Sequence, residues 1–120
     1  MIPSELLPAY EKCRLIQKHH GKTYYFSSLL FPKEIRPHVH AVYGFVRLPD
    51  EIVDNPQHSD PLKITRELRQ FRKLTIQAHA GRTVEHDILN AFGHTMRSMN
   101  IQLKDSLDFL DAMEQDLTVK

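Results

Sequence analysis

The sequence predicts an all-α protein, and two observations support that prediction. Apolar residues recur at helical spacing over most of the 120 residues, which indicates amphipathic helices. The breaks between these segments are short and rich in proline, glycine or polar residues, as is typical of a helical bundle. No segment shows convincing strand alternation, so we expect five or six helices in one domain, residues 1–120.

The first part of the chain predicts two helical segments. One spans about 4–20 or begins after Pro8, and Gly21 ends it. Residues 24–31 are almost wholly apolar or hydroxylic, which suits a buried helix or an irregular hairpin arm. Pro32 ends this segment.

The middle of the chain predicts a long helix followed by a loop. The helix covers about 33–54, and Pro49 should kink it near its end. Residues 55–61 form the loop, in which Asp60 is an N-cap and Pro61 the first helical residue.

Three helices follow that loop. Gly81 closes the first of them, and Thr83 can cap the second. The apolar residues on one face of the second helix are Ile88, Phe92, Met96 and Met99. The stripe of the third is Leu103, Leu107, Leu110, Met113 and Leu117.

Composition excludes several classes of protein. With 41% hydrophobic and 26% charged residues and a net charge of +1, the chain is an ordinary globular mixture, and we expect no nucleic-acid partner. Cys13 is the only cysteine, so no internal disulfide can form. The N-terminus lacks a signal-peptide pattern, and no apolar run approaches the roughly 20 residues of a membrane span. We expect a cytoplasmic protein.

Peripheral membrane contact stays open. The basic residues of the helix after the loop either form a solvated face or favour an anionic membrane surface. These residues are Arg66, Arg69, Arg72 and Lys73.

The most informative feature is a pair of aspartates, Asp50 and Asp54. Four residues apart on a helix, they lie on one face with Cβ atoms roughly 5–6 Å apart. Their apolar neighbours suggest a partly buried setting, in which two carboxylates repel each other unless a cation is present. Magnesium prefers such oxygens and keeps water or phosphates as its other ligands. The pair therefore predicts a magnesium–diphosphate site.

Cations and aromatic residues accompany the pair. Arg47 shares its helical side and could pair with Asp50 or bind a phosphate, and Tyr43 follows the same face. Residues 20–24 combine an imidazole, a glycine, a cation and a hydroxyl at a helix boundary, which is a natural anion cradle. The whole pattern suits a substrate with a diphosphate head and a hydrocarbon tail. Zinc binding by His19-His20 or His38-x-His40 is disfavoured, because no set of four ligands completes a tetrahedral site.

An ordered set of blocks resembles the N-terminal part of the squalene/phytoene synthases, the head-to-head prenyl transferases. Residues 112–116 resemble the family's next block less specifically, and the rest resembles it only in helical pattern. The matching blocks are residues 13–16, 20–24, Leu29, Leu30, Pro32, Arg36, Val39, 41–43, 45–47 and 50–54.

The resemblance implies an all-α isoprenoid (terpenoid) synthase fold, of which this chain is the N-terminal portion. It implies magnesium-assisted ionisation of a prenyl diphosphate and the joining of two prenyl chains through a cyclopropyl intermediate, giving squalene, phytoene or a related product. NADPH would be needed only for a squalene-type product.

By the same resemblance, Asp50 and Asp54 match the first aspartate-rich motif and would bind Mg²⁺, and Lys22 and Arg47 match contacts to diphosphate. The residues that would line the pocket are His20, Thr23, Tyr24 and Tyr43.

The sequence departs from the family in two respects. No second aspartate-rich motif precedes Lys120, because Asp105, Asp108 and Asp111 on a surface-like helix do not resemble it. Pro49 is unusual just before the first motif. The alternative is therefore a non-catalytic helical interaction or assembly module of the same fold, or a chain completed by another one. Apolar stripes left uncovered would also favour a homo-oligomer.

Overall fold

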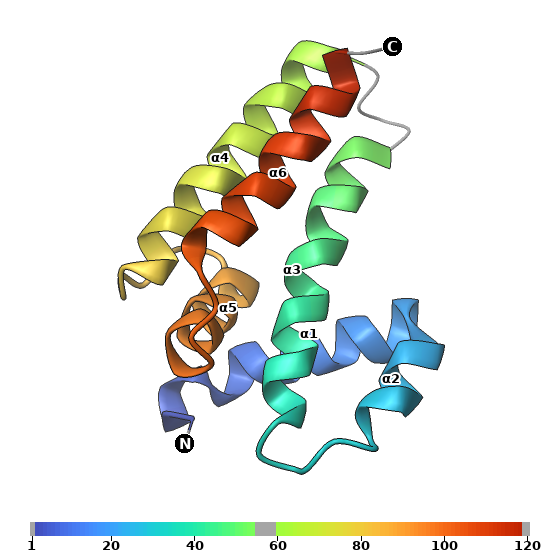
Figure 1. Ribbon diagram of the computed structural model, residues 1–120, viewed down its shortest axis with the longest axis vertical. Helices are drawn as coiled ribbons and strands as arrows, with labels where there is room; N and C mark the ends of the chain where they lie inside the picture. The colour runs from blue at the N-terminus through green and yellow to red at the C-terminus, as the bar shows by residue number, and fades with distance from the viewer. Residues whose placement is uncertain (1, 55–59, 119–120) are drawn as a thin grey trace.

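The computed structural model describes residues 2–54 and 60–118, and these residues form an all-α structure, as predicted. A 3-10 turn, η1 (Ser4–Leu6), precedes the α-helices. The α-helices are α1 (Leu7–His20), α2 (Lys22–Ser28), α3 (Arg36–Asp54), α4 (Pro61–His79), α5 (Asp87–Ser98) and α6 (Leu103–Thr118). In Figure 1, α3, α4 and α6 follow the long axis, while α1 crosses α3 and α2 lies beside the lower half of α3.

Two clusters of buried side chains hold the helices together, and α3 and α5 contribute to both. The larger lies among α3, α4, α5 and α6 and includes Phe45, Phe71 and Phe92. The smaller joins α1 to α3 and α5 through Tyr10, Cys13 and other residues. Because α3 is anchored from two sides, its remaining face is held in a defined position.

The start of α4 confirms the predicted cap. The Leu62 N–H donates to Asp60 Oδ1 at 3.0 Å, and Pro61 is the first helical residue, where its missing N–H is not needed. Gly81 follows α4 with φ +92°, a left-handed conformation that glycine adopts without strain. Of the predicted loop 55–61, residues 55–59 lie outside the described part of the chain.

The predicted cap of α5 is wrong. His86, rather than Thr83, is the N-cap, with its Nδ1 accepting from the Leu89 N–H. The Asn90 side chain bonds both the N–H and the carbonyl of Val84, at 2.8 and 2.9 Å, which holds the preceding segment extended. This local side-chain clamp, between residues six apart in the sequence, delays the start of the helix.

For the N-terminal region one prediction is confirmed and another needs correction. Of the two starts that the sequence left open for the first helix, the earlier one is right: η1 (Ser4–Leu6) leads directly into α1 at Leu7, because a proline is tolerated in a first helical turn. The segment after Gly21 is a helix, α2, but it is not buried: Tyr24 and Phe26 are each 67% exposed.

α3 runs without interruption from Arg36 to Asp54, with Pro49 buried inside it (Figure 1). The kink expected at Pro49 stays a prediction. Met99 is 41% exposed rather than in the core, since α5 ends at Ser98.

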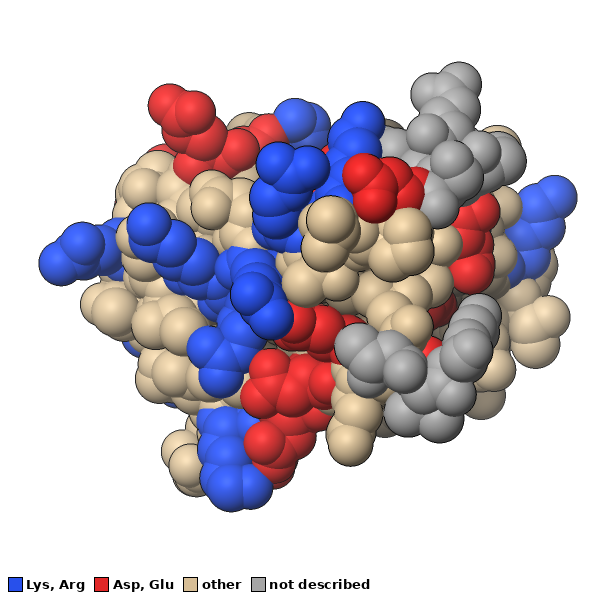
Figure 2. Space-filling model, turned by 90° about the horizontal axis from the view of Figure 1, so that it is seen from above, with Lys and Arg blue, Asp and Glu red and all other residues tan. Residues whose placement is uncertain are grey.

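The outer faces of α4 and α6 are joined by ion pairs. Arg69 contacts Glu114 at 2.8 Å and Arg72 contacts Asp111 at 2.9 Å, in the order that antiparallel helices require. Seen from above, a run of basic side chains borders a run of acidic ones in the lower part of the view (Figure 2). The basic stretch of α4 is therefore partly neutralised by α6.

Candidate functional site

Both predicted metal-binding aspartates lie at the C-terminal end of α3. Asp50 and Asp54 are exposed, which corrects the partly buried setting expected from their apolar neighbours. The apolar neighbours face the core, because α3 is amphipathic and turns its carboxylates to the other side. With Arg47 and Glu51 the two aspartates line a recess of about 290 Å³.

The aspartate carboxylates make no hydrogen bond or ion pair with any other residue in the described ranges. Nor do any three His, Cys, Asp or Glu side chains within those ranges form a group able to hold a metal ion. The recess thus offers two available carboxylates, and an ion there would need its other ligands from elsewhere.

Arg47 pairs with a residue that the sequence argument did not single out. Its Nε lies 3.3 Å from Glu51 Oε1 one turn along α3, rather than contacting Asp50. His20 at the end of α1 joins this group, with Nδ1 3.5 Å from the Arg47 guanidinium and Nε2 3.8 Å from the Glu51 carboxylate. The i, i+4 spacing of this arginine and glutamate on a helix could have predicted their ion pair from the sequence. The structure brings His20 and Arg47 together as predicted site neighbours.

The turn between α1 and α2 brings Tyr43 against the backbone of Gly21. A Cβ at position 21 would lie 2.6 Å from Tyr43 Oη, so only glycine permits this approach. The Tyr43 ring also lies 6.4 Å from that of Tyr24 on α2. Lys22 and Thr23, the other predicted pocket residues, are exposed in the first turn of α2.

A large apolar groove of about 740 Å³ runs along α3 towards the carboxylates. Val39, Tyr43 and Val46 line it, and one turn further along the same helix Arg47 and Asp50 line the acidic recess. The rise from Tyr43 to Asp50 is about 10 Å along the helix axis. The other lining residues are Gln17, Tyr24, Ser27, Ser28, Phe31, Ile35, His38, Val42, Thr95, Met99 and Ile101.

The α5 side of this groove was not foreseen. Thr95, Met99 and Ile101 lie more than forty residues beyond the end of α3 in the sequence, and no local pattern marks them as groove residues. Gln17 was likewise missed, although a glutamine on the apolar side of a helix was a usable signal.

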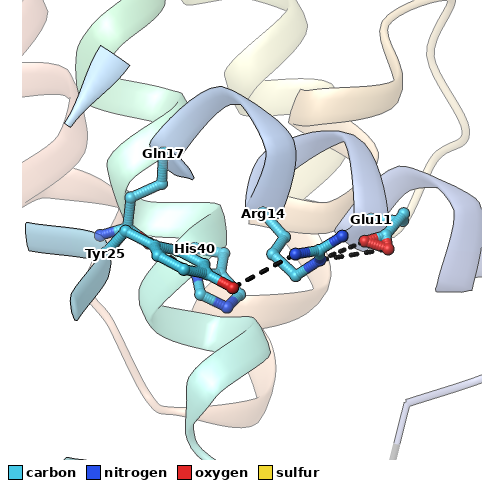
Figure 3. A network of polar contacts seen from close by, with 5 residues as sticks. All are labelled: Glu11, Arg14, Gln17, Tyr25 and His40. Atoms are coloured by element: carbon cyan, nitrogen blue, oxygen red, sulfur yellow. Dashed lines mark hydrogen bonds and ion pairs between the residues drawn. The ribbon is translucent and has the colours of Figure 1, made fainter. Parts of the chain in front are cut away.

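His40 has a structural role at the junction of three helices (Figure 3). Its Nδ1 donates to Gln17 Oε1 at 2.5 Å, and its ring stacks on Tyr25 at 5.9 Å. Arg14 donates to the Tyr25 hydroxyl at 3.2 Å and pairs with Glu11. Burial, reinforced by the Arg14 charge, lowers the pKa of His40. This network ties α1, α2 and α3 together behind the groove.

No helix in the described ranges combines the length and the apolar character needed to cross a membrane.

Comparison with known proteins supports the resemblance. The 15-cis-phytoene synthase of Synechococcus elongatus is 43% identical over 54 residues, covering 45% of this chain and 18% of the relative. The chloroplastic phytoene synthase of an Oncidium hybrid is 30% identical over 112 residues, covering 91% and 26%. Phytoene synthase 1 of Zea mays is 29% identical over 115 residues, covering 93% and 27%. No solved structure matches the chain significantly.

The chain thus spans about a quarter of the length of the plant relatives that it matches almost from end to end. The family model for squalene/phytoene synthase matches residues 17–120, which include α2 to α6 and both aspartates. This protein therefore belongs to the squalene/phytoene synthase family.

Proposed function

We propose that this chain carries part of the active site of a prenyltransferase that joins two prenyl diphosphates head to head. The observation that carries the proposal is that an apolar groove and a recess with a pair of exposed carboxylates adjoin each other along α3. A hydrocarbon tail fits the groove, and a diphosphate head would then lie beside Asp50 and Asp54. Binding sites of this kind are mostly apolar with a few polar groups that fix orientation.

The residues at the recess fit magnesium. Asp50 and Asp54 offer hard oxygen ligands, on one face of a helix, with no partner among the described residues. Magnesium is commonly bound by one or two carboxylates together with substrate phosphates, so two ligands from this chain suffice to anchor it. When bound, the ion supplies positive charge that stabilises a departing diphosphate. We place any opposing metal ligands outside the described residues.

The cationic side chains of the chain would hold the diphosphate. Arg47 is half-buried, and its partner Glu51 is partly exposed, so a phosphate can replace this ion pair at little energetic cost. A guanidinium can bind two phosphate oxygens at once, which would fix the head group. His20 and Lys22 lie on the α1–α2 side, and Tyr43 separates head from tail.

The names of the relatives favour a phytoene-type product over a squalene-type one. A phytoene-type reaction needs no reductant, whereas a squalene-type product would require NADPH. Product chain length would follow from the depth of the completed groove.

Calorimetry with magnesium chloride and farnesyl thiodiphosphate, an unreactive substrate analogue, tests the proposal. We expect binding that requires magnesium and that weakens by more than about tenfold when Asp50→Asn and Asp54→Asn are combined. The matched control is Glu85→Gln with Asp105→Asn, which removes two exposed carboxylates elsewhere and should leave binding unchanged.

Magnesium-dependent binding that survives the loss of both aspartates would place the metal elsewhere and refute the assignment. Absence of binding by the wild-type chain would favour the alternative of a helical assembly module.

A further inference from the structure

The apolar groove has a polar point in its wall where α3 faces α5. His38 and Thr95 both line the groove, and His38 Nδ1 lies 2.9 Å from Thr95 Oγ1. No other hydrogen bond of His38 to a described residue is present, so its Nε2 is available. A hydrocarbon-binding groove has no evident need for an imidazole, and the catalytic argument above does not use this one.

A continuous chain of hydrogen bonds leads from this point to the surface. Thr95 Oγ1 lies 2.7 Å from the Tyr10 hydroxyl, which in turn lies 2.7 Å from His94 Nδ1. His94 Nε2 then lies 3.3 Å from the hydroxyl of Ser98, which is exposed. This series of hydrogen bonds, the relay, thus links the groove to solvent through α1, α3 and α5.

Packing between aromatic rings holds these hydrogen-bonded side chains in place. The rings of His38 and His94 stack at 6.0 Å, and Tyr10 meets each of them edge-on at 5.8 Å. Tyr10 and Thr95 are buried, so neither hydroxyl has bulk water as an alternative partner. Buried hydroxyls of this kind keep their protein hydrogen bonds.

The titratable side chains of this hydrogen-bonded series, His38, His94 and Tyr10, are uncharged near neutral pH. Burial lowers the pKa of His38, and burial together with His38 and Arg97 lowers the pKa of His94. Burial raises the pKa of Tyr10 to about 12, although its bond with Thr95 opposes that rise. A neutral imidazole has one N–H donor and one acceptor nitrogen, so each histidine can receive a proton on one side and release one on the other.

We infer that His38 is a proton acceptor in the groove and that Thr95, Tyr10 and His94 relay a proton from it to solvent. This inference rests on the proposed function, since joining two prenyl chains through a carbocation leaves a positive charge that the loss of a proton can quench. The C–H bond beside the cationic carbon breaks, its electron pair becomes the new C=C bond, and the proton adds to His38 Nε2.

The proton balance then closes along the chain. His38 passes its Nδ1 proton to Thr95, which passes its own to Tyr10, and Tyr10 passes its own to His94 Nδ1. His94 releases its Nε2 proton to water beside Ser98. Exchange of the imidazole protons with water restores the starting tautomers.

The relay requires one arrangement of protons at rest. His38 must carry its proton on Nδ1, donating to Thr95, and His94 must carry its proton on Nε2. Free histidine in water favours the opposite tautomer to the one required of His38, so this arrangement is diagnostic. Long-range ¹H–¹⁵N NMR of the protein at about pH 8, above the pH range in which imidazoles titrate, identifies both tautomers directly.

Thr95→Val keeps the shape of the side chain and removes the link. We expect His38 to move to the Nε2–H tautomer in that variant. The relay is overturned if wild-type His38 already has its proton on Nε2, or if Thr95→Val leaves the His38 tautomer unchanged.

A second measurement tests whether the acceptor faces the ligand. N,N-dimethylfarnesylamine, protonated at neutral pH, presents an N–H⁺ on a prenyl tail and contains no diphosphate. We expect it to bind without magnesium, and binding should weaken about tenfold in His38→Leu, which loses a hydrogen bond to a charged donor. His79→Leu, at the far end of α4, should bind the amine like wild type.

Equal binding by His38→Leu, or no binding of the amine by wild type, would overturn the assignment. Because this probe needs neither metal nor Asp50 and Asp54, its outcome is independent of the calorimetric test of the diphosphate site. The NMR arm uses the wild-type chain and so does not depend on the folding of any His38 variant.

Discussion

Phe45 is the side chain that fixes the orientation of α3, and its truncation tests the whole arrangement. The residue is 2% exposed and lies in the larger core cluster. Its ring stacks on Phe92 with centroids 4.1 Å apart and lies 5.7 Å from Phe71 and 5.9 Å from Phe109. Because Phe45 faces the core, the carboxylates beyond it face solvent.

The expected loss follows from these contacts. Phe45→Ala removes a fully packed aromatic ring and leaves a cavity, which costs about 3–5 kcal/mol. A chain of 120 residues has a free energy of unfolding of roughly 6–18 kcal/mol, so the variant loses a large share of its stability. Phe26→Ala makes the same chemical change where the ring is 67% exposed, and its effect should stay within about 0.5 kcal/mol.

Urea denaturation followed by circular dichroism measures both variants against wild type, with Phe45→Leu as a milder core change. We expect Phe45→Leu to fall between the two alanine variants, since it retains most of the apolar volume. Equal losses for Phe45→Ala and Phe26→Ala, or a loss below about 1 kcal/mol for Phe45→Ala, would refute the packing described for α3.

Three further predictions follow from the structure. Asp60→Ala should lower the free energy of unfolding by about 1 kcal/mol, because it removes the cap of α4, whereas Thr83→Ala should change it little; chemical denaturation distinguishes the two. Gly21→Ala should displace the Tyr43 ring, which its Cβ would meet at 2.6 Å, and should weaken farnesyl thiodiphosphate binding in calorimetry while costing about 1 kcal/mol of stability. Burial lowers the pKa of four histidines, so below about pH 6.5 the unfolded chain binds more protons than the folded one. The urea midpoint should therefore fall as the pH drops from about 7 to about 5. An unchanged midpoint would show that these rings are not buried. The four are His38, His40, His86 and His94.

Sequence patterns anticipated those features that depend on neighbouring residues. The cap at Asp60 and the stop at Gly21 follow from local propensities, and the structure confirms them. For residues 24–31 the sequence left a helix and a hairpin arm open, and the structure shows the helix α2. The expectation for Thr83 failed because the Asn90 side chain, six residues beyond Val84, holds the intervening backbone extended. A side-chain hydrogen bond made by Asn90, in the first turn of α5, overrode the capping preference of Thr83 there.

The candidate site divides in the same way. The spacing of Asp50 and Asp54 places them on one face of a helix whatever that helix packs against. Their exposure is decided by which side of α3 is covered, and Phe45 decides this by packing against α4, α5 and α6. The ion pair of Arg47 with Glu51 was local and accessible, whereas its contact with His20 needed the turn at Gly21.

What the sequence by itself determined was the all-α class, the family resemblance and the register of two aspartates, because these depend on period and on short-range order along the chain. What only the tertiary structure decided was the groove beside those aspartates and the hydrogen-bonded path from His38 to Ser98. The path joins residues of α1, α3 and α5, and the groove adds residues of α2 and of the neighbouring loops. These residues lie far apart in the chain, and they meet because burial of the two apolar clusters brings α1, α3 and α5 together.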